Sequence, residues 1–197
     1  MKKSVYLPLI LLLLVAMSCQ KSDDSVAPVS EQKKMLMAVN WTIDKVIAST
    51  DYTMTTSVGS TPVKQSQVME GLSDECEYAA TMQFARDEKV VIGYAANFCG
   101  LENPAANNVK WRSDDAVSEL TLIGENLAGF SVNIQGDHMS NGNEATFKVK
   151  ELSPQKLTIE RSIPISSFFS EDVLALYASQ GITMQGTYTY TTTYIAR

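Results

Sequence analysis

The chain is poor in the residues from which catalytic and metal sites are usually built. It has one histidine, His138, and three cysteines among 197 residues. His138 lies in the turn-rich segment 136–142, and the sequence ties no nucleophile to it. The cysteines include no Cys-x-x-Cys pair, so a zinc or iron–sulfur site has little support. We therefore expect no enzyme and no metal ion.

Phosphate-binding loops and a basic surface are also missing. The chain contains no P-loop and no dinucleotide fingerprint. Its 22 acidic residues outnumber 16 basic ones, and the net charge of −6 argues against nucleic acid and against anionic headgroups of a membrane surface as partners. The acid pairs Asp114–Asp115 and Glu171–Asp172 fit a turn and a helix start rather than a catalytic dyad. Asp137, Asn141 and Asn143 lack calcium-loop spacing. We expect no cofactor.

The longest apolar run lies at the beginning of the chain. Lys2 and Lys3 precede an unbroken apolar run over residues 9–15. The mostly apolar stretch 5–17 is short for a membrane-spanning helix, which needs about 20 residues. A basic start, a short apolar core and small residues before a cleavage point are typical of a secretory signal. We predict that residues 1–18 form a signal peptide that is removed.

Residues 16–19, Ala-Met-Ser-Cys, resemble the lipobox of bacterial lipoproteins. The resemblance implies that Cys19 is the lipid site and carries palmitate-type acyl chains, two of which anchor a protein stably. The polar, aperiodic residues 19–32 are then a flexible tether. Asp23 and Asp24 resemble the export signal of some Gram-negative outer-membrane lipoproteins. The resemblance implies an outer-membrane location and favours the cell surface over the periplasmic face.

The two remaining cysteines are Cys76 and Cys99. An even pair in an exported protein most simply forms one disulfide. A disulfide would close a loop of about 24 residues and stabilise the fold by about 3 kcal/mol in the chain-entropy model. Two free thiols are the alternative.

Most of the chain shows the two-residue alternation of half-buried strands. The clearest case is the segment 76–84, in which Tyr78, Met82 and Phe84 share one face. A turn at Asp87–Glu88 and a second alternating run over residues 90–94 complete a hairpin. Further strands are predicted over residues 41–43, 109–111, 120–122, 130–134, 147–149 and 157–159, with turns at 113–115 and 153–155.

The last strand and two helices complete the expected elements. The segment 187–195 places its tyrosines on one face and mostly threonines on the other. Ser30 is a suitable N-cap for a short helix over residues 31–39, and Ser170 for a helix over residues 171–179 that ends before Gly181. Nine or ten strands without βαβ alternation favour an all-β, antiparallel up-and-down barrel over a parallel sheet. A two-sheet sandwich stays open.

The order of these elements resembles the lipocalin-like domain of small bacterial lipoproteins. Trp41 opens the first strand, Cys76 begins a strand that ends in an aromatic residue and a charged turn, and Cys99 lies after the next strand. Trp111 lies on a middle strand, and the segment 151–159 resembles the late hairpin of the family.

The resemblance covers residues 33–162, and residues 33–197 are expected to form one domain. Residues 51–70 and 163–185 depart from the usual short form. The resemblance implies a non-catalytic, monomeric lipoprotein that holds a small apolar ligand in a barrel cup. The residues expected to line the cup are Tyr78, Tyr94, Trp111, Phe130, Tyr188 and Tyr190.

Other uses of the same residues remain open. The aromatic side chains can simply fill the barrel, with the protein acting as a structural or interaction module. A row of aromatic side chains on an outer face can stack on sugar rings instead. The apolar segment 163–169 is expected to cap the barrel mouth, and an exposed apolar patch there would favour docking of a partner.

Overall fold

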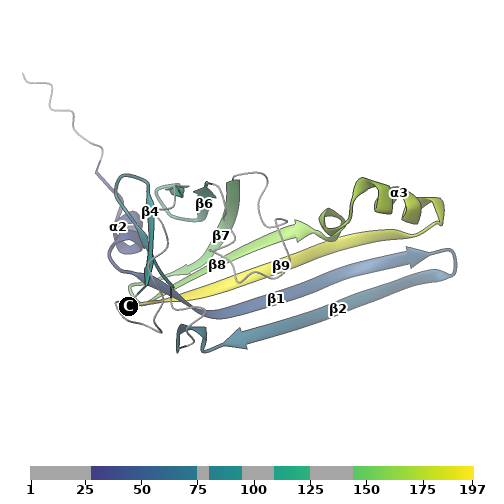
Figure 1. The fold of residues 1–197 in the computed structure, drawn as a ribbon, viewed down its shortest axis with the longest axis horizontal. Helices are drawn as coiled ribbons and strands as arrows, with labels where there is room; N and C mark the ends of the chain where they lie inside the picture. The colour runs from purple at the N-terminus through teal and green to yellow at the C-terminus, as the bar shows by residue number, and fades with distance from the viewer. Residues whose placement is uncertain (1–27, 75–79, 95–108, 125–143) are drawn as a thin grey trace, which may run out of the picture.

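The computed structural model describes residues 28–74, 80–94, 109–124 and 144–197, and the structural statements below refer to these residues. They form one nine-stranded antiparallel sheet with two α-helices (Figure 1). The all-β, antiparallel prediction is confirmed. No helix among the described residues has the length and apolarity needed to cross a membrane.

Along the chain, one α-helix comes first, eight strands follow, and a second α-helix precedes the ninth strand. In chain order they are α2 (Glu31–Met37), β1 (Trp41–Thr56), β2 (Gly59–Glu70), η1 (Leu72–Asp74), β3 (Ala80–Phe84), β4 (Val90–Tyr94), β5 (Lys110–Ser113), β6 (Glu119–Ile123), β7 (Glu144–Leu152), β8 (Lys156–Pro164), η5 (Ile165–Phe168), α3 (Glu171–Ser179) and β9 (Thr183–Ala196).

The strand ladders of the sheet form an open path. Its order is β4-β3-β1-β9-β8-β7-β6-β5, and β2 pairs with β1 beside β3. The two end strands, β4 and β5, share no ladder; an isolated bridge between Lys89 and Lys110 joins them, and the Val90 N–H donates to the Val109 carbonyl at 2.9 Å. Ladders do not close the sheet, so the predicted barrel is not confirmed.

The predicted helices and hairpins are confirmed, because local sequence signals specify them. The Ser30 hydroxyl accepts a hydrogen bond from the Lys33 N–H at 3.2 Å and caps α2. The Ser170 hydroxyl caps α3 in the same way, and Gly181 follows that helix with a φ of 67°. The hairpins β3–β4, β5–β6 and β7–β8 have the expected turns.

The large core side chains lie in the compact part of the molecule, which we call the body: α2, β3–β7, and the parts of β1, β8 and β9 that contact them. Trp41 is fully buried and donates its indole N–H to the Leu36 carbonyl at 2.8 Å. Phe84 packs edge-on against Trp111, with ring centroids 5.5 Å apart. Alternating strands supply this core, as the two-residue pattern predicts.

The long strands continue beyond the body as an arm, defined here as residues 49–67 and 165–189. Figure 1 shows β1, β2 and β9 running together past the short strands, with α3 beside the beginning of β9. β1 pairs with β2 from Lys45 to Thr56 and with β9 from Trp41 to Thr55. Residues 51–70 therefore extend the first hairpin into the arm.

The predicted apolar loop 163–169 is ordered secondary structure instead. β8 continues to Pro164, and residues 165–168 form η5, which packs on β9. Ile163 and Ile165 are buried, and Phe168 and Phe169 are half-buried. Phe169 packs edge-on against Tyr177 of α3. The segment is an internal connection with its apolar side chains largely covered.

Candidate functional site

The residues predicted to line one cup are divided between the body and the arm. Trp111 is 5% exposed, and its indole N–H donates to the Ala85 carbonyl at 2.9 Å. Its polar group is therefore satisfied by the backbone, and its ring packs against Phe84. Trp111 occupies a core position in the body. It does not line either of the two grooves described below.

Tyr190 also packs in the core. It is 2% exposed and lies two pleats from Tyr194 on the same face of β9. Burial, together with the nearby Tyr190, raises the pKa of Tyr194 well above its usual value. As predicted, the tyrosines of β9 share the more buried face of the strand. Tyr190 and Tyr194 are buried, whereas Thr191 and Thr193 on the other face are half-buried.

Several predicted site residues lie outside the described residues. They are Cys19, Cys76, Tyr78, Cys99, Phe130 and His138. Tyr94 ends β4, where its backbone pairs with Ala80.

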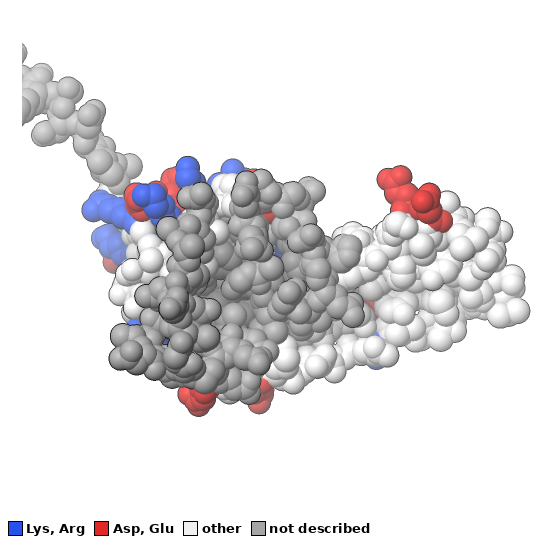
Figure 2. Space-filling model, viewed as in Figure 1, with Lys and Arg blue, Asp and Glu red and all other residues white. Residues whose placement is uncertain are grey.

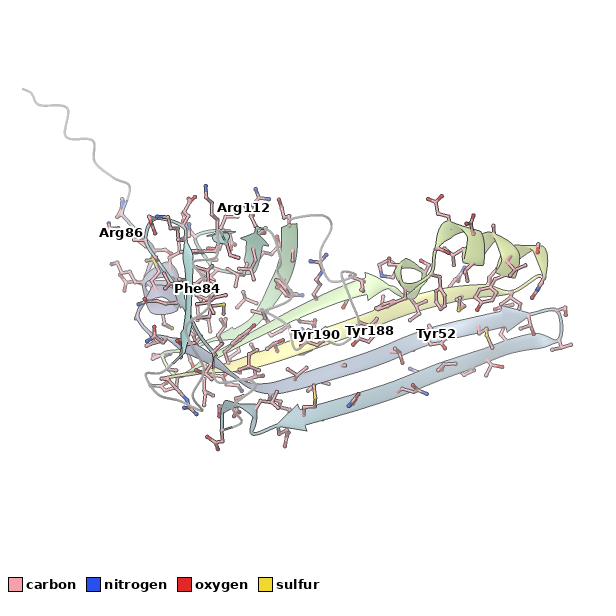
Figure 3. All side chains as sticks on the ribbon, in the orientation of Figure 1. Tyr52, Phe84, Arg86, Arg112, Tyr188 and Tyr190 are labelled. Atoms are coloured by element: carbon pink, nitrogen blue, oxygen red, sulfur yellow. The ribbon has the colours of Figure 1, made fainter. Side chains whose placement is uncertain are left out.

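Tyr188 differs from the other tyrosines of β9, because it is only half-buried and lies where the arm leaves the body. Figure 3 shows Tyr188 farther along the sheet than Tyr190, toward Tyr52. Its ring packs edge-on against Phe168 of η5, with centroids 5.0 Å apart and an interplanar angle of 66°. Its hydroxyl oxygen is buried and has no hydrogen-bond partner among the described residues, and burial raises the pKa of Tyr188.

A groove of about 570 Å³ opens beside Tyr188 at the base of the arm. Its floor comes from neighbouring strands, since Thr50 of β1 lies directly opposite Tyr188 of β9 and Gln65 of β2 lies directly opposite Thr50. The lining residues are Ala48, Thr50, Gln65, Ser66, Gln67, Phe168 and Tyr188. We call this the Tyr188 groove. It combines an aromatic wall with amide and hydroxyl groups.

The same face of the sheet carries an arginine that sequence reasoning did not single out. On β8, the alternation Leu157, Ile159, Arg161, Ile163 places an arginine among side chains that are otherwise buried and apolar. Its guanidinium carbon lies 5.9 Å from the centroid of the Phe147 ring. That interruption of an apolar alternation is the sequence signal that identifies the position.

Arg161 is not paired with a carboxylate in the described part of the chain. Its Nη1 atom is buried without a hydrogen-bond partner, and burial lowers the pKa of its guanidinium. A guanidinium stays charged in proteins, and an unpaired buried donor costs about 1–3 kcal/mol. A fold that keeps such a group at this cost has a free donor for a ligand.

The strands β7 and β8 separate at Arg161. They pair from Lys148–Glu160 to Leu152–Leu157, whereas the first residues of β7 pair only with β6 and the last residues of β8 only with β9. A groove of about 730 Å³ occupies this divergence. Its lining residues are Glu119, Glu144, Thr146, Lys148, Glu160, Arg161, Ser162 and Ile163.

The described residues offer aromatic, hydroxyl and amide groups that can contact a ligand. No group of three or more His, Cys, Asp and Glu side chains among them is placed to hold a metal ion. The Tyr188 groove supplies hydroxyl and amide groups but no paired nucleophile and base. What the arrangement offers is an apolar contact surface with a few hydrogen-bonding groups.

No family model matches this chain, and no curated protein matches its sequence. The residues and their geometry therefore carry the functional proposal.

Proposed function

We propose that the protein is an exported, lipid-anchored and non-catalytic binding protein that holds a small, mainly apolar ligand. The observation that carries the proposal is the Tyr188 groove. Its aromatic wall is formed by Tyr188 and Phe168, and the unpartnered Tyr188 hydroxyl is a directed polar group. Small-molecule sites typically combine apolar walls with a few such polar groups.

The body is proposed to be a lipocalin-like barrel of eight strands. Two backbone hydrogen bonds between the end strands support closure: the Val90 N–H donates to the Val109 carbonyl, and the Trp111 N–H donates to the Glu88 carbonyl at 2.7 Å. The large side chains of the body fill its centre. The ligand is therefore placed at the open end, where the arm begins.

The location follows from the sequence. Residues 1–18 are proposed to be a signal peptide, Cys19 the acylated residue, residues 19–32 the tether and residues 33–197 one monomeric domain. This places the domain at the outer membrane, on the cell surface, where it has access to amphiphiles. A disulfide between Cys76 and Cys99 fits that oxidising location.

An interaction module is the second candidate function, and the arm favours it. β2 is a twelve-residue strand that pairs with β1 over almost its whole length, and most of its side chains are exposed. Figure 2 shows that, apart from acidic side chains over α3, the visible face of the arm carries little charge. A long exposed edge strand is a template for pairing with another chain.

A groove-filling variant separates the two candidates. The test protein is residues 19–197 with Cys19→Ser, which contains every described element. Its binding of the neutral fluorescent probe N-phenyl-1-naphthylamine is compared with that of Gln67→Trp. Gln67 lines the Tyr188 groove, and the neighbouring Val68 is 51% exposed and lies on the opposite face of β2, so Val68→Trp is the matched control.

Ligand binding in the groove predicts saturable binding by the parent chain and by Val68→Trp, with a loss of about tenfold or more in Gln67→Trp because the indole occupies the site. Equal probe binding in all three chains would contradict the proposed site. No binding by the parent chain would favour the interaction module.

A further inference from the structure

Arg161 lies near acidic residues, but each of them has a cationic neighbour elsewhere. Glu160 is adjacent in β8 and therefore points to the opposite face, where its Oε1 lies 3.4 Å from Lys150 Nζ. The acids that line the divergence of β7 and β8 are Glu119, opposite Lys148; Glu144, paired with Arg112; and Glu160, paired with Lys150. None forms an ion pair with Arg161 within the described chain.

Among the buried polar atoms that have no hydrogen-bond partner within the described residues, three lie on the neighbouring strands β8, β9 and β1. They are Arg161 Nη1 on β8, Tyr188 Oη on β9 and Thr50 Oγ1 on β1. Thr50 and Tyr188 are direct cross-strand neighbours. Arg161 lies opposite Tyr190, which makes Tyr188 its diagonal neighbour on the same face, at a typical spacing of about 7–8 Å. Buried polar groups in proteins are nearly always hydrogen-bonded, so unpartnered atoms on these register neighbours are consistent with a missing partner.

The chemistry of these groups selects the partner. A guanidinium donates hydrogen bonds only, and it binds carboxylates and phosphates with charge-assisted bonds. A tyrosine hydroxyl and a threonine hydroxyl donate to the same oxygens. The ring of Phe168 against Tyr188, and the ring of Phe147 beneath Arg161, provide apolar surface around the donors.

We infer that the ligand is an amphiphile with an anionic head group, a carboxylate or a phosphate monoester, which Arg161, Tyr188 and Thr50 hold while the chain lies along the Tyr188 groove. This inference rests on the proposed binding function and specifies its ligand class. The negative net charge of the protein does not oppose it, because the nearest acids are paired with cations and Arg161 is not.

The test compares three twelve-carbon amphiphiles that differ only in the head group. The assay measures how well dodecanoate, dodecyl phosphate and the neutral 1-dodecanol each compete with N-phenyl-1-naphthylamine for residues 19–197 carrying Cys19→Ser. The variants are Arg161→Met, which keeps an apolar side chain over Phe147, and Tyr188→Phe. Arg86 is exposed at the β3–β4 turn and lies far from Tyr188 in Figure 3, so Arg86→Met is the charge-matched control.

The inference predicts that at least one anionic amphiphile binds the parent chain about tenfold or more tightly than 1-dodecanol. Arg161→Met should remove that difference, and Tyr188→Phe should reduce it. Arg86→Met should leave the binding of all three amphiphiles unchanged. The preferred anion identifies the head group as carboxylate or phosphate.

Two results would overturn the inference in distinguishable ways. Equal displacement by all three amphiphiles would reject the anionic head group and leave the proposed binding function standing. Failure of the probe itself to bind would reject both. Thermal unfolding provides the folding control. Arg161→Met removes a half-buried charge that has no ion-pair partner within the described residues, so it should not lower the Tm of the ligand-free protein. A lower Tm would mean that Arg161 is structural.

Discussion

The three tyrosines of β9 on the inner face have the same residue type but different surroundings. Tyr190 and Tyr194 are each 2% exposed, whereas Tyr188 is half-buried with an unpartnered hydroxyl. The alternation of tyrosine and threonine predicts their common face correctly. How far each tyrosine side chain is buried depends on the element that packs on it, which for Tyr188 is η5. A two-residue alternation carries no information about which element packs on a residue.

Tyr194 is expected to make the protein sensitive to high pH. Burial raises its pKa in the folded state, so the unfolded chain releases this proton first, from about pH 10 upward. The free energy of unfolding should then fall with rising pH above that point, by up to about 1.4 kcal/mol per pH unit for one tyrosine. Tyr194→Phe should reduce this slope.

Urea denaturation at several pH values between about 8 and about 11 measures the slope. At neutral pH the variant should differ from the parent by only about 1 kcal/mol, because it loses one hydroxyl. An unchanged slope in the variant would show that Tyr194 ionises equally in both states.

Trp111 and Tyr188 illustrate what the sequence leaves open about the site. Both are aromatic residues with a polar group on predicted strands, so they were expected to line one cup. The structure places Trp111 in the body with its N–H bonded to Ala85, and Tyr188 at the base of the arm. Strand order and register decide this separation, and alternation alone does not specify either.

At the scale of elements, hairpins and helices were predictable, whereas the arm was not. The hairpin β3–β4 buries one face of each strand, which gives a clear alternation. In the arm, β1 continues through residues 51–56 with exposed and half-buried positions and many threonines. Without a full core on either face, the hydrophobic signal is weak, and pairing with β2 and β9 maintains the strand instead.

Gly186 is expected to determine how closely β1 and β9 approach in the arm. It lies opposite Tyr52 with a φ of 144°, and a Cβ added there would collide with the Asp51 carbonyl and with Tyr52. Gly59 has a similar φ of 147°, but a Cβ there meets nothing within 4 Å. A substitution at either glycine would strain the backbone, because both have a positive φ. Only a substitution at Gly186 would also produce a steric clash.

Gly186→Ala should reduce stability more than Gly59→Ala, by about 1–3 kcal/mol, because of this overpacking. Urea denaturation measures the difference, and hydrogen exchange of amides in residues 49–55 and 183–189 locates it in the arm. Equal effects of the two substitutions would contradict the close pairing of β1 with β9.

At the scale of the whole molecule, the protein has a filled body and an arm, with the Tyr188 groove where they meet. The sequence predicted the all-β class, and it predicted a membrane anchor that belongs to residues outside the described ranges. It did not single out Arg161. The interrupted apolar alternation marks the position, but only the structure shows that Arg161 Nη1 has no hydrogen-bond partner among the described residues.

Cys19→Ala should release the protein from membranes. Two acyl chains on Cys19 would anchor it stably, and the rest of the described chain contains no helix that crosses a bilayer. In a Gram-negative host, fractionation should move the variant largely into the soluble fraction. Ser18→Ala, which keeps a small residue before the cysteine, is the control and should stay with the membranes. Membrane retention of Cys19→Ala would reject the lipoprotein assignment.

The most direct test of the central claim is native mass spectrometry of residues 19–197 carrying Cys19→Ser, purified without detergent, together with analysis of its organic extract. The account predicts a co-purifying amphiphile with an anionic head group, bound one to one, and its loss from Gln67→Trp. A bare parent chain, or a ligand that Gln67→Trp retains equally, would contradict the binding groove.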